Sequence, residues 1–311
     1  MKLTCLMVLR NLLLGAAFVG ILAVTSGCES KKAELGTKEN PVKLYFVPSV
    51  DAKIIETSGQ QFKEWLEKNT PYKYEIGIPQ SYIAVVEAFG SKRADVASIN
   101  TFGYIEAYEK YGVEARLTVL RHGLATYQSQ FITKSDSPIQ SIKDLNGKDI
   151  AFVDPSSASG YLLPLKMLKD NNVVVDQEIF AMSHDSVISR IYQGQVDAGA
   201  TFYSPPYKGE IQDARRLVKT QYPDVEKKIK IIGLSEPILN DPIVFRKAMP
   251  EEMKKVIAEA FVKYISTTEG KDVFKKTYGV TDLQPATDKD YEAVRATFKS
   301  LKKSAEEMVK M

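Results

Sequence analysis

Short apolar runs alternate with longer amphipathic stretches from Pro41 onward. Runs of this kind predict buried strands, and apolar residues at helical spacing predict helices between them. Strands separated by helices are typical of βαβ units, so a parallel sheet is expected in this part of the chain. The predicted elements are a strand at 42–47, a helix at 60–68, a strand at 74–78, a helix at 81–89 and a strand at 94–99.

A second series with the same order begins near residue 129. Its predicted elements are strands at 129–133, 150–153, 178–182 and 196–201, with helices at 141–148, after residue 160 and at 186–193. Apolar runs at 229–234 and 242–245 lead the chain back. From Pro250 the pattern is helical to the end, including helices at 253–265 and 291–308. Two α/β lobes are therefore predicted. Residues 41–128 with 236–311 form the first, and residues 129–235 form the second.

A loop rich in hydroxyl groups joins the strand at 150–153 to the helix that follows. It contains Ser156, Ser157, Ser159 and Gly160. The first amides of a helix lack intrahelical partners and carry a partial positive charge, so these groups can cradle an anion. A single serine that only caps the helix is the alternative. Pro164 conflicts with a cap at Ser159, because its ring would then fall beyond the first turn.

The first 27 residues have the features of an export signal. Lys2 and Arg10 precede an apolar run from 12 to 24, which is shorter than the roughly 20 residues of a spanning helix. Cys28 follows small residues in an order that resembles a bacterial lipobox, although Thr25 departs from the usual leucine or valine. Lipidation at Cys28 is expected, and an ordinary signal peptide before an unmodified cysteine is the alternative. Residues 28–40 then form a charged tether.

Charge and cysteine content exclude a nucleic-acid-binding protein and a protein stabilised by internal disulfides. Removal of residues 1–27 takes away Lys2 and Arg10, so the formal charge falls from +3 to +1, which is no field for nucleic acid. Cys5 leaves with the signal, so the mature chain has no internal disulfide. Stability must come from a hydrophobic core, which 44% hydrophobic residues can supply.

Three segments together resemble the phosphonate, phosphite and phosphate binding proteins of ABC transporters: 135–145, 154–164 and 241–247. The resemblance implies a type II periplasmic binding protein, with two α/β lobes that are joined by two crossover strands and close on a ligand. It further implies a substrate-binding lipoprotein that is held at a bacterial membrane in the periplasm and delivers its ligand to an ABC permease. Neither an enzymatic activity nor a cofactor is expected.

The resemblance also implies a set of ligand-binding residues. Ser157, Ala158 and Ser159 would hold the phosphorus oxygens, but Ala158 stands where many members have threonine. Asp241 matches an acidic residue that meets the amine of aminoalkyl phosphonates, whereas its glutamate partner falls on Ser204. The resemblance carries no lysine or arginine into the site, and it implies at most a modest preference for aminoalkyl ligands. The remaining matches, which could instead be structural residues, are Tyr82, Tyr127 and His184.

Three alternatives remain open from the sequence. Ser157, His184 and Asp197 could form a hydrolase triad, although no G-x-S-x-G motif surrounds a candidate serine. A metal site is disfavoured because His122, His184 and Cys28 have no ligand spacing. The same fold could also bind a larger or apolar solute such as a lipid, given the aromatic residues Phe102, Tyr104, Phe202, Tyr203 and Tyr207.

Overall fold

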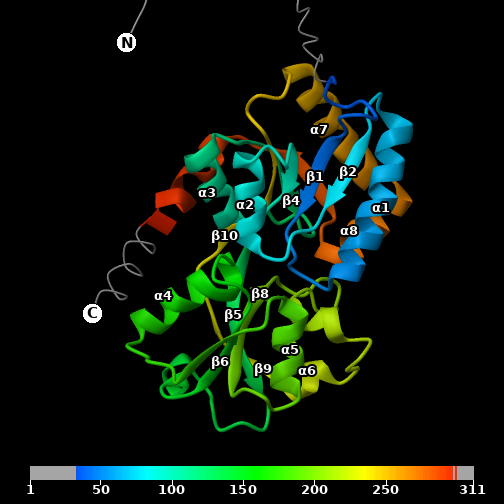
Figure 1. Ribbon diagram of the computed structural model, residues 1–311. Helices are drawn as coiled ribbons and strands as arrows, with labels where there is room; N and C mark the ends of the chain where they lie inside the picture. The colour runs from blue at the N-terminus through cyan, green and yellow to red at the C-terminus, as the bar shows by residue number, and fades with distance from the viewer. Residues whose placement is uncertain (1–32, 297, 300–311) are drawn as a thin grey trace, which may run out of the picture. The chain divides into compact units, whose positions relative to one another are not determined.

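Two mixed β-sheets, each covered by helices, organise the computed structural model, which describes residues 33–296, 298 and 299 (Figure 1). The first sheet has the order β12-β4-β11-β3-β1-β2. Strand β1 runs parallel to β2 and β3, whereas β11 is antiparallel to β3 and β4. The strands are β1 (Val42–Phe46), β2 (Tyr74–Gly77), β3 (Val96–Ser98), β4 (Glu114–Leu120), β11 (Pro242–Phe245) and β12 (Asp282–Pro285).

Helices cover both faces of the first sheet (Figure 1). On one side lie α1 (Ala52–Asn69), α7 (Glu251–Ser266) and α8 (Thr268–Tyr278), and on the other lie α2 (Tyr82–Gly90) and α3 (Thr101–Tyr111). Phe62 of α1 is fully buried against α7 and α8, with ring centroids 4.6 Å from Phe261 and 5.4 Å from Phe274. Edge-to-face contacts of this kind lock the three helices together over the sheet.

The second sheet has the order β10-β5-β8-β6-β7, and β9 pairs with β5 along the same edge as β10, opposite β8. Strand β6 is parallel to β7 and β8, and β5 is antiparallel to β8 and β9. The strands are β5 (Thr126–Lys134), β6 (Asp149–Phe152), β7 (Gln177–Phe180), β8 (Ala198–Tyr203), β9 (Ile229–Leu234) and β10 (Ile238–Leu239). The helices are α4 (Leu163–Asp170), α5 (His184–Tyr192) and α6 (Val225–Lys228), with 3₁₀ turns at Ile142–Leu145 and Ala214–Val218.

Two chain segments connect the sheets. The chain passes from β4 to β5 and returns from β10 to β11, and Ile238 of β10 pairs with Tyr127 of β5 where the segments meet. Segments of this kind are the usual location of a hinge between lobes. We call the part built on the first sheet lobe 1 and the part built on the second lobe 2.

The two lobes contact each other through hydrogen bonds along the gap between them. The His184 amide donates to the Ser49 carbonyl at 3.2 Å, and the Asn100 side-chain amide donates to the Ser156 carbonyl at 2.8 Å. The His122 ring of lobe 1 stacks on the Tyr207 ring of lobe 2, with centroids 4.1 Å apart. We call this arrangement, in which the two lobes contact each other, the closed arrangement.

Several elements differ from the sequence-based predictions. Helix α1 begins at Ala52 rather than at residue 60, because exposed polar side chains and Gly59 weaken the apolar pattern of its first half. Helix α3 and strand β4 were not predicted. The chain beyond Pro250 is not helical to its end as predicted, because β12 pairs with the unpredicted β4. The signal segment, Cys28 and the next four residues of the predicted tether lie outside the described residues, as does the end of the helix predicted at 291–308.

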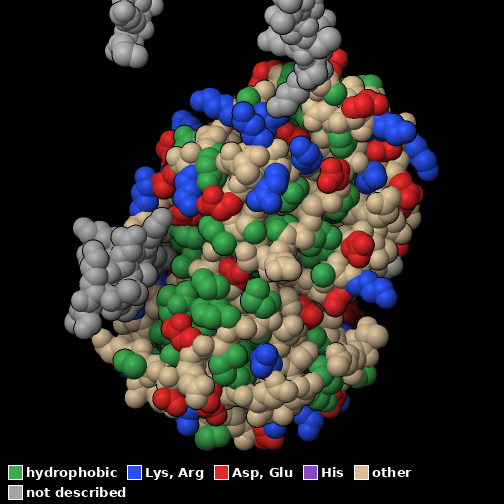
Figure 2. All heavy atoms as spheres, in the orientation of Figure 1, with side chains coloured by type: hydrophobic (Ala, Val, Ile, Leu, Met, Phe, Trp, Pro, Cys, Tyr) green, Lys and Arg blue, Asp and Glu red, His purple; other side chains and the backbone are tan. Residues whose placement is uncertain are grey.

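On the face shown in Figure 2, basic and acidic side chains are interspersed rather than gathered by sign. Within residues 33–299, apart from the undescribed position 297, no helix has the length and apolar character needed to cross a membrane.

Candidate ligand-binding site

A small cavity lies between the lobes and has a volume of about 50 Å³. That is room for a few water-sized groups. Seven of the eight ligand-binding residues expected from the sequence line it: Tyr82, Tyr127, Ser157, Ala158, Ser159, His184 and Asp241. The eighth, Ser204, is buried just beyond the end of β8 and is not among the lining residues.

The serine loop forms one turn of π-helix, Ala158–Leu162, that continues into α4. Such turns are rare and are frequently found at functional sites. Ser157 caps the turn, because its hydroxyl accepts from the Gly160 amide at 3.1 Å, and its own proton remains available for a ligand. The amides of Ala158 and Ser159 fall in the first turn, where no intrahelical acceptor exists. This helix start can therefore present several donors to one anion.

The π-turn also explains Pro164. Because the turn holds five residues, α4 itself begins at Leu163, and Pro164 falls in the first turn of α4. The two carbonyl groups of the π-turn that the missing amide would face accept instead from the Ser129 hydroxyl at 2.6 Å and the Val153 amide at 3.1 Å, so no acceptor is left without a partner. The distortion expected from a cap at Ser159 therefore does not arise.

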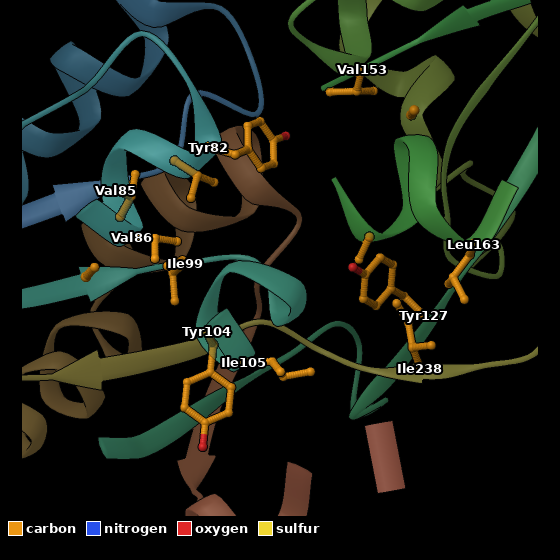
Figure 3. Packing of buried hydrophobic residues seen from close by; sticks show 14 of the residues in the cluster. Tyr82, Val85, Val86, Ile99, Tyr104, Ile105, Tyr127, Val153, Leu163 and Ile238 are labelled. Carbon is orange, nitrogen blue, oxygen red and sulfur yellow. The ribbon is translucent and has the colours of Figure 1, made fainter. Parts of the chain in front are cut away.

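Two tyrosine hydroxyls enter the site from different elements. Tyr82 is the first residue of α2, and Tyr127 lies near the start of β5; both rings extend toward the region between the lobes (Figure 3). Burial, followed by the charge of Asp154, raises the pKa of Tyr82, and burial with the charge of Asp241 raises that of Tyr127. The Tyr82 hydroxyl has no hydrogen-bond partner within the described residues. Both groups are thus neutral donors at physiological pH.

His184 is the first residue of α5 and is 5% exposed. Its ring packs edge-on against Phe202 at 4.9 Å, and its Nδ1 atom finds no hydrogen-bond partner in the described part of the chain. Burial, and secondly the charge of Arg121, lower the pKa of His184 to about 3. The imidazole is therefore neutral at neutral pH and can donate one hydrogen bond.

The depressed pKa of His184 predicts acid lability. An unfolded histidine gains its proton near pH 6.5 while the folded one does not until about pH 3, so the unfolded state binds more protons in between. The free energy of unfolding should thus fall by about 1.4 kcal/mol for each pH unit below 6.5. Urea denaturation at several pH values should show that the free energy of unfolding depends less steeply on pH in His184→Asn than in the wild type. Parallel curves for the two proteins would contradict a buried, neutral imidazole.

The carboxylate of Asp241 is already bound within lobe 1. One oxygen accepts from the Arg121 guanidinium at 3.2 Å, and the other accepts from the Thr101 amide at 3.3 Å. Asp241 therefore lines the cavity as one half of an ion pair. This differs from the free acidic residue that the resemblance implies.

The cavity lining also includes polar residues that the sequence analysis did not identify, among them Asn100, Arg121, Arg216 and Tyr278. The resemblance carried no arginine into the site, yet two arginines line the cavity. Arg121 follows the unpredicted strand β4, and Arg216 lies in a 3₁₀ turn with no apolar periodicity, so no local signal marked either residue. Tyr278 ends α8, and its buried hydroxyl has no hydrogen-bond partner within the described residues.

The geometry disfavours the alternative interpretations. Asp197 accepts from the Asp149 amide at the opposite end of the second sheet, away from Ser157 and His184, so no triad is assembled. Among the described residues, no three His, Cys, Asp or Glu side chains gather as metal ligands would. A cavity of about 50 Å³ is also far smaller than the several hundred Å³ that larger ligands occupy.

Two α/β lobes that are joined by two crossover segments and close over a small, donor-lined cavity define a type II periplasmic binding protein, which confirms the predicted fold class. The family described as "ABC transporter, phosphonate, periplasmic substrate-binding protein" matches residues 44–291. The chain belongs to this family.

Individual relatives agree with this assignment. The chain is 30% identical to the phosphate-import protein PhnD of Mycolicibacterium smegmatis, over 90% of this chain and 92% of that protein. It is 28% identical to the phosphonates-binding periplasmic protein of Escherichia coli, over 72% and 68% of the two chains. PhnD1 of Prochlorococcus marinus, solved in complex with methylphosphonate, has a similar fold, with a TM-score of 0.72, 18% identity, and coverage of 84% and 98%.

Proposed function

We propose that this protein is the substrate-binding component of an ABC importer and captures a small phosphorus oxyanion, such as phosphate, phosphite or methylphosphonate, between its lobes. The observation that supports this most strongly is the convergence of donors from both lobes on one small cavity. Tyr82 comes from lobe 1, Ser157 and Ser159 come from lobe 2, and Tyr127 comes from the crossover between them.

Each group has a defined role in this proposal. The Ser157 and Ser159 hydroxyls and the amides of the π-turn hold oxygens at the helix start, where the partial positive charge favours an anion. Tyr82, Tyr127 and neutral His184 donate to the remaining oxygens. Because lobe 1 and lobe 2 both contact the ligand, binding favours the closed arrangement by its differential affinity.

A thermal-shift screen of the purified protein tests this function. A ligand at about 100 times its Kd should raise the free energy of unfolding by about 2.7 kcal/mol. We expect stabilisation by at least one phosphorus oxyanion and none by dispersed lipids of the same concentration. Stabilisation by lipid alone would support a larger apolar solute instead.

Anchoring to a membrane is the second part of the proposal. We propose that Cys28 is lipidated and becomes the first residue of the mature protein, because it follows a signal-like segment and small residues. Several acyl chains are needed for a stable anchor, since one chain binds only weakly.

Replacing Cys28 tests this anchor. Cys28→Ser should leave the protein unprocessed or release it from the membrane fraction, whereas Cys5→Ser, within the signal, should leave fractionation unchanged. The readouts are the intact mass and the distribution between membrane and soluble fractions. Identical mass and fractionation of Cys28→Ser and wild type would show that Cys28 is not the anchor.

A further inference from the structure

Two guanidinium groups and one carboxylate line the cavity. Arg121 belongs to lobe 1, while Arg216 extends from lobe 2 toward Gly279 of lobe 1, where a Cβ atom added to the glycine would lie 3.1 Å from the Arg216 Nη2 atom. Asp241 supplies the carboxylate. The formal charge of these three side chains is therefore positive, and it comes from both lobes.

Arg121 is held in place by lobe 1. Its Nη2 atom donates to Asp241 at 3.2 Å, and its Nε atom donates to the Tyr278 carbonyl at 3.3 Å. Its Nη1 atom donates to the Asn240 side chain, and the guanidinium lies 5.4 Å from the Tyr127 ring centroid. A guanidinium with this many fixed contacts cannot readily leave Asp241 to make way for another cation.

Arg216 adds a second charge to the same space. Burial, and next the charge of Arg121, lower the pKa of Arg216 to about 10, so the side chain remains protonated at neutral pH. Asp213 binds the neighbouring Arg215 through both carboxylate oxygens at 3.0 and 2.8 Å, and its charge also acts on Arg216, whose pKa it raises.

The cavity offers an ammonium group no other carboxylate. Among the lining residues that the structure describes, only Asp241 has one, and both of its oxygens accept hydrogen bonds from Arg121 or Thr101. A neighbouring cavity of about 30 Å³ shares Arg121 and Asp241, and its other described lining residues have no carboxylate. A ligand with an ammonium substituent would therefore meet two guanidinium groups and no free acid.

We propose that Arg121 and Arg216 are specificity-determining residues that select small oxyanions without a cationic substituent. Arg121 does so by holding the Asp241 carboxylate in an ion pair, and both arginines repel an ammonium group. This inference rests on the proposed function, because it concerns the same cavity and the same oxyanion. It reverses the modest aminoalkyl preference that the sequence alone suggests.

Titration of wild type and Arg121→Met with methylphosphonate and 2-aminoethylphosphonate tests the inference. The wild type should bind 2-aminoethylphosphonate at least about tenfold more weakly than methylphosphonate, because the ammonium group is brought close to two guanidinium groups. Arg121→Met frees Asp241 to meet the ammonium group, so the affinity ratio should shift by about tenfold or more toward 2-aminoethylphosphonate. Arg93→Met, an exposed arginine outside the cavity, should leave the ratio unchanged.

Two further variants keep the test decisive if Arg121→Met fails to fold. Asp241→Asn should not weaken 2-aminoethylphosphonate binding selectively, because its carboxylate is not an ammonium site. Arg216→Gln should weaken methylphosphonate more than 2-aminoethylphosphonate. A wild type that prefers 2-aminoethylphosphonate, with that preference lost in Asp241→Asn, would overturn the inference while leaving oxyanion binding intact. Absence of binding by any phosphorus oxyanion would instead refute the proposed function.

Discussion

Replacing Gly160 by alanine is expected to reduce oxyanion affinity by about 100-fold or more. A Cβ atom at this position would lie 2.4 Å from Cγ2 of Val153 and 2.9 Å from the Ser157 hydroxyl. The Gly160 carbonyl also accepts from the Val153 amide at 3.1 Å, so the π-turn sits directly against the end of β6. The turn must move to accept the methyl group, and Ser157 and Ser159 must move with it.

The size of this effect follows from the number of contacts that are lost together. A hydrogen bond to a charged acceptor contributes about 1.5–3 kcal/mol, and displacement of the turn removes at least two. Titration calorimetry measures the change. Ser156→Ala is the matched control, because Ser156 contacts Asp154 and Asn100 through its backbone, which the substitution keeps. Affinity of Gly160→Ala within threefold of wild type would mean that the π-turn does not hold the ligand.

The second large effect is expected from removing one hydroxyl group from each lobe. Tyr82→Phe and Ser159→Ala should each weaken binding by about 10- to 100-fold, since each deletes one donor to a charged acceptor. The double variant should lose about 100-fold or more if the two contacts are independent. Both side chains are buried, and both substitutions keep most of the side-chain volume.

Comparison of the single and double variants distinguishes a two-lobe clamp from binding by lobe 2 alone. Tyr192→Phe serves as the control, because its hydroxyl donates to Asp224 and is not among the groups lining the cavity. Loss of affinity in Ser159→Ala but not in Tyr82→Phe would show that lobe 1 does not contact the ligand. Loss in both variants is the result that the clamp requires.

The parts of the fold that the sequence predicted correctly are those with local periodicity. The strands β1, β6, β9 and β11 lie within one or two residues of their predictions, because short apolar runs bounded by polar residues are distinctive. Strand β12 was missed, since it lies in a region whose local pattern is helical. It forms by pairing with β4, a long-range contact that no local pattern reveals.

The candidate site was predictable only where its chemistry is local. Ser157 and Ser159 lie in one loop whose residue types indicate an anion site, and the family resemblance located Tyr82, Tyr127 and His184. Arg121 and Asp241 are far apart in sequence, so their ion pair appears only when β4 and β11 are paired in the sheet. The prediction for Asp241 was therefore incomplete, because a long-range contact determines what its carboxylate can bind.

Calorimetric titration of the purified wild-type protein with phosphate, phosphite and methylphosphonate tests the central claim most directly. We expect at least one of the three to bind with a Kd of about 1 μM or below, which corresponds to a binding free energy of about −8 kcal/mol or a more favourable value. The cavity supplies enough hydrogen-bond donors for this affinity even if only a few of them contact the ligand. If none of the three binds more tightly than millimolar, the cavity is not an oxyanion site.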